Sequence, residues 1–202
     1  MAPNYRQRSH PSGPPPGERE FRIAQGTYTH ELVAEVARRS RTEPPAFIDA
    51  ALRSMAAEVV SDAIWGRRTR TARLVACGQA AIYKSCFLPP QNWILLGTEV
   101  EIEGGRLDAL WEIPEFGGVL YDEVKTSQSL RIPTGPGPTA EQVARYVDHG
   151  VRNSTPERPF IGVRLLFLAS PGSSRLVTPT GSRLLSETEF WFEARLERAR
   201  VV

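Results

Sequence analysis

Two acidic residues and one lysine have the types and spacing that suit hydrolytic chemistry. Glu123 and Lys125 are two residues apart at the end of an apolar run, and Asp108 stands fifteen residues before Glu123. The chain has 25 lysine and arginine residues, of which only Lys84 and Lys125 are lysines. Carboxylates bind Mg²⁺, and a lysine beside them can orient or deprotonate water, whereas an arginine stays protonated. These residues therefore predict a site at which a metal ion activates water.

The predicted strands bring the two carboxylates together. Side chains alternate between the two faces of a strand, so Glu123 and Lys125 project from the same side. A four-residue loop that pairs Ile113 with Gly118 places Asp108 directly opposite Glu123.

A tight turn before this strand pair predicts a third carboxylate nearby. Gly104-Gly105 is a two-residue hairpin signal, and pairing Glu103 with Arg106 across it places Glu101 opposite Asp108. Opposed carboxylates repel unless a cation lies between them, so Glu101 is a further candidate metal ligand. The alternative is a solvated sheet face whose charges form surface ion pairs contributing about 0–1 kcal/mol.

The spacing of apolar residues predicts an α+β fold. One helix, after Pro44-Pro45, carries Ile48, Leu52, Met55 and Val59 along a single stripe. The predicted elements are helices at about 31–39 and 46–64, strands at 94–103, 106–113 and 118–126, a helix at about 140–151, a strand at 160–169 and a last helix from 186. The strand that follows a helix cannot pair through a tight turn, which makes the central sheet mixed.

Length and composition fit one globular domain. Residues 1–20 are rich in proline and glycine and almost free of apolar side chains, so we predict a disordered tail followed by a single domain over 21–202. No apolar stretch approaches the length of a membrane span, and the N-terminus lacks a signal-peptide core. We therefore expect a cytoplasmic protein without a membrane partner. The net charge of +2 is too small to indicate nucleic-acid binding by itself.

Three short motifs resemble, in order, those of the PD-(D/E)XK nuclease superfamily and, within it, the RecB-like exonuclease branch. Gly105 and Asp108 are similar to the GxxD motif of that branch, Glu123 and Lys125 to its ExK motif, and Gln142 and Tyr146 to its QxxxY motif. The motifs cover residues 105–146, and the predicted order of elements over about 45–169 agrees with the family core. The resemblance implies a restriction-endonuclease-like αβββαβ core with a central mixed β-sheet flanked by helices.

The resemblance also implies a role for each residue of the acidic motifs. Asp108 and Glu123 would hold a Mg²⁺ or Mn²⁺ cofactor together with the backbone carbonyl of Val124. Lys125 would position or activate the hydrolytic water.

The helical motif is implied to contact DNA. Gln142 and Tyr146 are four residues apart and share one helix face, which in the family meets the DNA strand near the scissile phosphate. Each residue has a structural alternative. Thr139 and Gln142 fit a capping box, and Tyr146 fits a core position of an amphipathic helix.

In this family a histidine or glutamate from the first core helix usually adds a metal ligand. The helix predicted over 46–64 has no histidine, and its acids are Glu58 and Asp62. Glu58 is the candidate ligand, with a surface carboxylate as the alternative. His30 and His149 are expected to be ordinary surface or packing residues.

Two cysteines, Cys77 and Cys86, cannot supply a four-thiolate site. We therefore expect two small buried hydrophobic residues there, and no iron–sulfur cluster of the kind that many relatives carry. A basic stretch follows the 46–64 helix and suits either a phosphate backbone or a solvated surface; it contains Arg67, Arg68, Arg70 and Arg73.

Together these residues predict a Mg²⁺- or Mn²⁺-dependent DNA nuclease of the RecB-like exonuclease type. One alternative is a catalytically inactive, nuclease-like subunit that binds DNA or protein within a larger complex. A selective endonuclease of a restriction or mobile-element system would use the same site. The chain has no obvious specificity domain, so besides DNA we expect a partner such as a helicase or another protein of a DNA-processing or defence complex.

Overall fold

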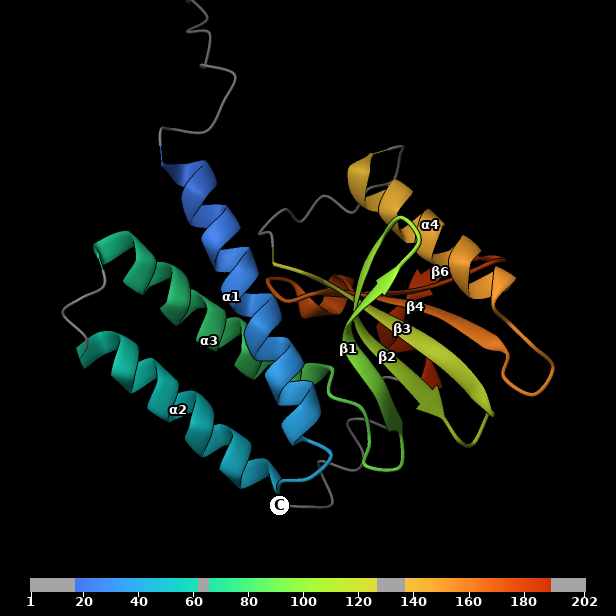
Figure 1. The fold of residues 1–202 in the computed structure, drawn as a ribbon, viewed down its shortest axis with the longest axis horizontal. Helices are drawn as coiled ribbons and strands as arrows, with labels where there is room; N and C mark the ends of the chain where they lie inside the picture. The colour runs from blue at the N-terminus through green and yellow to red at the C-terminus, as the bar shows by residue number, and fades with distance from the viewer. Residues whose placement is uncertain (1–16, 62–65, 127–136, 190–202) are drawn as a thin grey trace, which may run out of the picture.

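The structure is a computed structural model, and it describes residues 17–61, 66–126 and 137–189. A helical layer lies beside one β-sheet, and a further helix crosses that sheet (Figure 1). The helices are α1 (Glu18–Arg39), α2 (Pro45–Ser61), α3 (Arg67–Cys86) and α4 (Pro138–Arg152), with short 3-10 helices at Pro171–Ser173 and Leu185–Glu187. The strands are β1 (Ile94–Ile102), β2 (Gly105–Ile113), β3 (Gly118–Lys125), β4 (Phe160–Phe167), β5 (Arg175–Thr178) and β6 (Gly181–Leu184).

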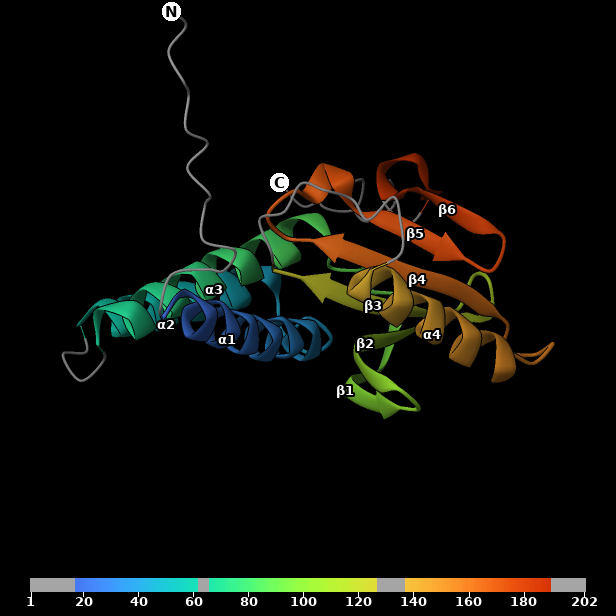
Figure 2. The same cartoon turned by 90° about the horizontal axis from the view of Figure 1, so that it is seen from above.

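The strands follow one another across the sheet in chain order, from β1 to β6. Neighbouring strands are antiparallel except β3 and β4, which are parallel because α4 returns the chain across the sheet between them. Figure 2 shows α4 beside β3 and β4, with α1, α2 and α3 grouped apart from it. The predicted α+β arrangement, with a mixed sheet flanked by helices, is confirmed.

Apolar side chains form two clusters on the sheet. One cluster joins α1, α2 and α3 to the strands and contains Val36, Ile48 and Trp111. The other cluster lies under α4 and contains Tyr146 and Leu165. Burial of both sheet faces explains why the strand pattern of β4 is almost continuously apolar.

Small residues allow α1 to pack closely against α3. Ala37 of α1 and both Ala76 and Ala80 of α3 are fully buried. The separation of packed helices depends on the size of the side chains at their contact, so alanines at these positions permit a close approach. This packing fixes where α1 lies relative to β1 and β2, which it also contacts.

The helical layer departs from the predicted elements in two places. Helix α1 begins at Glu18, inside the predicted tail, and the acidic residues of its first turn interact favourably with the helix dipole there. Helix α3 was not predicted. Its buried residues Ala72, Ala76 and Ala80 recur every four positions, a helical pattern that the arginines at its start obscured. Residues 1–16 of the predicted tail lie outside the described part of the chain.

The C-terminal part also differs from the prediction. Strands β5 and β6 form an antiparallel hairpin that was not predicted. The helix predicted from residue 186 is represented by the 3-10 turn Leu185–Glu187, and its continuation past residue 189 lies outside the described residues. Of the described helices, none combines the length and the apolar composition that crossing a lipid bilayer requires.

A buried ion pair joins β3 to β4. Asp122 and Arg164 are cross-strand partners whose side chains are 0% and 1% exposed. Arg164 donates from Nε to Oδ1 at 2.6 Å and from Nη2 to Oδ2 at 2.7 Å, and from Nη1 to the carbonyl of Phe87 at 3.0 Å. Trp111 Nε1 and the Tyr83 hydroxyl also donate to Oδ2, at 2.9 and 3.2 Å. Charges are tolerated in a core when their hydrogen bonds are satisfied in this way.

Replacing Arg164 with alanine should lower the free energy of unfolding by about 3–5 kcal/mol, because the Asp122 carboxylate would stay buried without its cation. Urea denaturation measures this loss. Arg158→Ala is the matched control, since the Arg158–Glu112 pair is half exposed and should contribute about 0–1 kcal/mol. Equal losses for the two variants would contradict a structural role for the buried pair.

Candidate active site

Strands β2 and β3 bring Asp108 and Glu123 to one cleft. The two strands pair in the predicted register, beginning with Ile113 opposite Gly118, and their backbone ladder ends one position before the two carboxylates. There Asp108 Oδ2 accepts a hydrogen bond from the backbone N–H of Val124 at 2.6 Å. Asp108, Glu123 and Val124 all line the cleft, so the two carboxylates face a common space.

Glu101 does not reach this cleft, and the prediction for it is wrong. The β1–β2 turn pairs Ile102 with Gly105, two residues out of step with the predicted register. Gly104 has the left-handed conformation (φ 85°) that closes the turn one residue earlier than expected. Glu101 consequently pairs with Arg106 and is exposed.

Two residues that the sequence did not single out as ligands complete a cluster around Asp108. Glu99 takes the position opposite Asp108, and His30 of α1 places Nδ1 at 2.5 Å from Asp108 Oδ1. One ligand atom from each of these three side chains lies within 4.8 Å of the others. His30 was expected to be a surface or packing residue, because the helix predicted at 31–39 began too late to include it. The sequence does hold one indication of its position. His30 stands three residues before the buried Val33, a helical spacing that places both on the inner face of α1.

Glu58, the predicted ligand from the first core helix, lies elsewhere. It is exposed on α2, accepts a hydrogen bond from Ser54 at 3.2 Å and borders a separate hollow between the helices. The helix that approaches Asp108 is α1 rather than α2. Asp62 lies outside the described residues.

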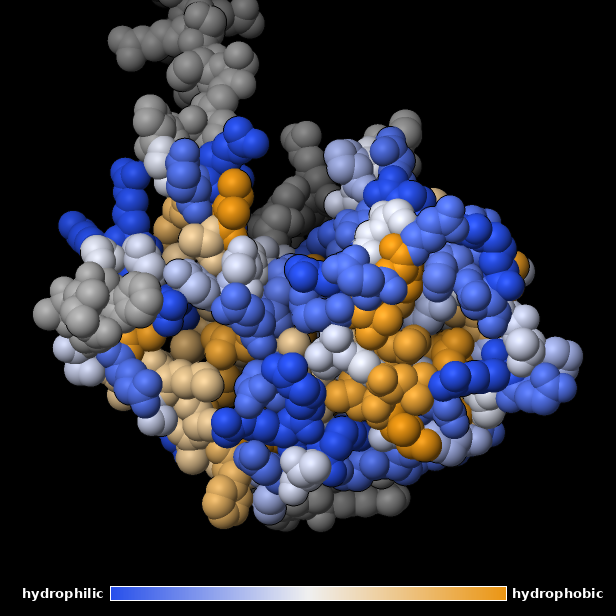
Figure 3. All heavy atoms as spheres, viewed as in Figure 1, coloured by the Kyte–Doolittle hydropathy of each residue, from blue (hydrophilic) through white to orange (hydrophobic). Residues whose placement is uncertain are grey.

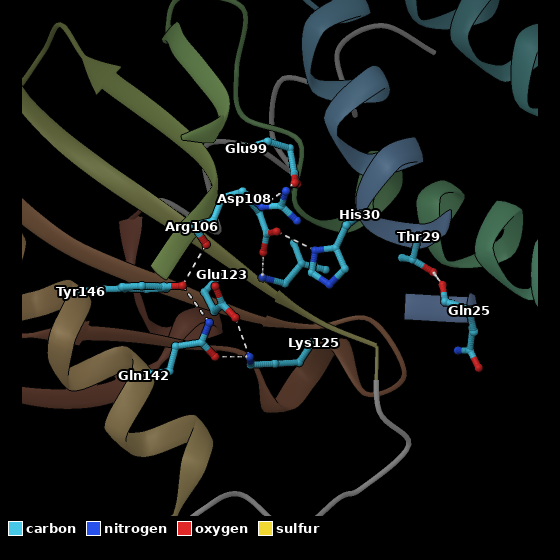
Figure 4. Close-up of polar contacts among 11 residues, drawn as sticks. Gln25, Thr29, His30, Glu99, Arg106, Asp108, Glu123, Lys125, Gln142 and Tyr146 are labelled. Atoms are coloured by element: carbon cyan, nitrogen blue, oxygen red, sulfur yellow. Dashed lines mark hydrogen bonds and ion pairs between the residues drawn. The ribbon is translucent and has the colours of Figure 1, made fainter. Parts of the chain in front are cut away.

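A chain of hydrogen bonds connects Glu123 to α4 (Figure 4). Lys125 Nζ donates to Glu123 Oε1 at 2.5 Å and to Gln142 Oε1 at 2.7 Å. Gln142 Nε2 donates to the hydroxyl of Tyr146 at 2.7 Å, and that hydroxyl donates to the carbonyl of Arg106 at 2.8 Å. The lysine is therefore held at the cleft by two partners from different elements.

The capping-box alternative for Gln142 is not what the structure has. Helix α4 begins at Pro138, and its N-cap position makes no side-chain hydrogen bond. The amide of Gln142 is turned toward Lys125 and not toward the start of its own helix (Figure 4).

Tyr146 is a core residue that also orients the amide of Gln142. Its side chain is 0% exposed, so direct contact with DNA, as predicted for it, does not fit this arrangement. Its ring lies against Gly105, where a Cβ atom would stand 2.8 Å from the hydroxyl oxygen. Only glycine at that position lets the tyrosine reach the carbonyl of Arg106.

The arginine stretch lies apart from the cleft. It covers the first turns of α3, and the described lining of the cleft includes none of its four members; these are Arg67, Arg68, Arg70 and Arg73. Arg73 stacks over the ring of Tyr28, with Cζ 4.3 Å from the ring centroid. The cleft borders instead on Arg106 and Lys125, and Figure 3 shows polar surface where α1 meets the β1–β2 hairpin.

Burial and neighbouring charges shift the pKa values of three groups in or beside the cleft. Burial raises the pKa of Glu123 to about 7, and the neighbouring Asp108 carboxylate adds to this rise while Lys125 opposes it. Burial also raises the pKa of Glu99, again with a contribution from Asp108. Burial lowers the pKa of His30, but its hydrogen bond to Asp108 and the surrounding carboxylates outweigh that effect, so the pKa lies above the usual 6.5. Protons or a metal ion would relieve this repulsion.

Comparison with known proteins identified no match among protein-family descriptions, curated proteins or solved structures. The functional assignment therefore depends on the chemistry of the cleft and on the motifs that line it.

The stability of the metal-free protein should fall as the pH rises through about 7. Between pH 4.5 and about 7 the folded state keeps a proton on Glu123 that the unfolded state has lost, so this contribution disappears above the folded pKa. His30, whose folded pKa is also raised, acts in the same direction. Glu123→Gln should remove up to about 3 kcal/mol of the difference between pH 5 and pH 8, measured by urea denaturation with a chelator present.

Glu157→Gln, at an exposed carboxylate in the loop before β4, is the control and should leave the pH profile as it is in the wild type. A Glu123→Gln profile identical to that of the wild type would show that Glu123 is not destabilised in the cleft.

Proposed function

We propose that this protein hydrolyses phosphodiester bonds of DNA with Mg²⁺ or Mn²⁺, as a RecB-like exonuclease of the PD-(D/E)XK superfamily. The observation that carries the proposal is one cleft lined by Asp108, Glu123 and Lys125, with Gln142 bonded to the lysine. The order α3-β1-β2-β3-α4-β4 supports it, because the restriction-endonuclease-like core has the same sequence of elements.

The residues present fit a divalent ion. Asp108, Glu123 and the carbonyl of Val124 offer oxygen donors, and His30 offers an imidazole nitrogen, a set that suits Mn²⁺ as well as Mg²⁺. Burial raises the pKa of Glu123 and the Asp108 carboxylate adds to the rise, and a bound divalent ion would oppose both effects. Bound there, the ion would lower the pKa of a coordinated water and offset the charge that develops on the phosphate.

Lys125 is suited to hold that water or a phosphate oxygen. An ammonium has three N–H donors, and Glu123 and Gln142 accept from two of them within the described part of the chain. The third can point into the cleft. Because two elements fix the lysine, its remaining donor is pre-oriented toward the reacting atoms.

Helix α4 supplies the DNA-facing side of the proposed site. Gln142 borders the cleft and is partly exposed, so it can meet a DNA strand beside the scissile phosphate. Tyr146 acts behind it, by holding its amide through the hydroxyl.

Lys125→Ala should reduce cleavage of DNA in Mn²⁺ or Mg²⁺ by about 100-fold or more, since proton transfer and water positioning contribute that much. Gel assays with end-labelled single- and double-stranded DNA measure the rate. Lys84→Ala is the matched control, because Lys84 is the other lysine and pairs with Asp49 at 2.6 Å on the helical layer.

The products separate the related hypotheses. Mononucleotides and short fragments released from an end support an exonuclease, and discrete internal fragments support an endonuclease. Binding of DNA without cleavage by the wild type would favour the inactive subunit. Equal rates for Lys125→Ala and the wild type would remove Lys125 from the chemistry.

His30→Ala should weaken Mn²⁺ binding by about tenfold or more, because it removes the nitrogen donor and the group that orients Asp108. Isothermal titration calorimetry measures the dissociation constant. His149→Ala is the control, since His149 lies on α4 beside the ring of Tyr121, away from the cleft lining. Equal Mn²⁺ affinity for His30→Ala and the wild type would contradict His30 as a ligand.

A further inference from the structure

Glu99 has a backbone conformation that a glutamate rarely adopts. Its φ of 54° makes it the only non-glycine residue with positive φ in the described part of the chain. The left-handed conformation is unfavourable for a residue with a Cβ atom. The β1–β2 register is irregular just before it, between Leu95 and Gly97. The strand is thus distorted where Glu99 meets Asp108.

The two carboxylate oxygens of Glu99 have different surroundings. Oε2 forms an ion pair with Arg106, at 2.8 Å from Nε. Oε1 is buried and accepts no hydrogen bond from any described residue. A buried carboxylate oxygen without a donor is costly, so a cation or a donor beside Oε1 would be stabilising. Figure 4 shows Glu99 and Arg106 beside Asp108, on the side of the cleft that α1 closes.

We propose that Glu99 is a further ligand of the divalent ion and that Arg106 positions it. This inference rests on the proposed function, and it adds a residue from β1 to a site otherwise built from α1, β2 and β3. One oxygen of Glu99 lies within 4.8 Å of the ligand atoms of both His30 and Asp108, close enough for a single ion to bind all three. Arg106 pairs with Oε2, so Oε1 is the oxygen that the ion would bind.

If Arg106 positions Glu99, removing this positively charged residue should weaken the binding of the divalent ion. A guanidinium near a metal site repels the ion, so an arginine that acts only through its charge would weaken metal binding, and its removal would strengthen it. An arginine that orients a ligand has the opposite effect. Outer-shell partners of metal ligands typically contribute 10- to 100-fold in affinity. The direction of the change therefore tells the two roles apart.

Calorimetric titration of the full-length protein with Mn²⁺ tests the proposal. Glu99→Gln should weaken binding by about tenfold or more, and Arg106→Gln by about three- to tenfold. The double variant should bind no more weakly than Glu99→Gln alone, because Arg106 acts through Glu99. Arg158→Gln is the matched control, since it breaks the exposed Arg158–Glu112 pair at the far end of β2 and should leave Mn²⁺ affinity unchanged.

Glu99→Asn checks that the loss comes from the ligand and not from misfolding. Asparagine tolerates the left-handed backbone, so this variant should bind Mn²⁺ as weakly as Glu99→Gln while its metal-free melting temperature rises or stays constant. Unchanged Mn²⁺ affinity in Glu99→Gln, or higher affinity in Arg106→Gln, would overturn the inference and leave the proposed function in place. Absence of Mn²⁺ binding by the wild type would overturn both.

Discussion

Four hydrogen bonds enclose the carboxylate of Asp122, from Arg164, Trp111 and Tyr83, on the face of β3 that meets the helical layer. Because side chains alternate along a strand, holding Asp122 on that face turns Glu123 to the other one. A slip of one residue would bring Glu123 into the core and expose Asp122, at the cost of an unpaired buried Arg164. The side of the sheet on which Glu123 lies is therefore determined by an ion pair that takes no part in the proposed chemistry.

A buried amide connects the two ends of the cleft. Gln79 of α3 accepts a hydrogen bond from the hydroxyl of Thr29 at 2.8 Å and donates to the carbonyl of Thr126 at 2.9 Å. Thr29 precedes His30 on α1, and Thr126 follows Lys125 at the end of β3. Both Gln79 and Thr29 are buried, so leaving their polar atoms unpaired would be costly. This constraint holds the histidine and the lysine at a fixed separation across the site.

Several features of the cleft lower the stability of the folded protein. Glu123 is almost fully buried beside Asp108, and its pKa is raised because Lys125 and His30 offset the burial and the neighbouring charge only in part. Glu99 adds a strained backbone and a carboxylate oxygen without a hydrogen bond from the described residues. Such features persist when the surrounding structure over-determines them, and they are typical of functional sites. The packed core beneath α4 and the Asp122–Arg164 pair supply the rigidity that keeps them in place.

Local signals in the sequence were sufficient for the strand pair that carries Asp108, Glu123 and Lys125, because a short loop and an alternating pattern set the register between neighbouring strands. The same reasoning misplaced Glu101, since one glycine with positive φ shifted the β1–β2 turn and brought Glu99 opposite Asp108 instead. His30 and Gln79 reach the site through the packing of α1 on α3, which no spacing within either segment specifies. Tertiary structure alone therefore decided which helix contributes a side chain to the cleft. The position of α1 depends on how its surface packs against the alanine-lined surface of α3, and these surfaces are far apart in the chain.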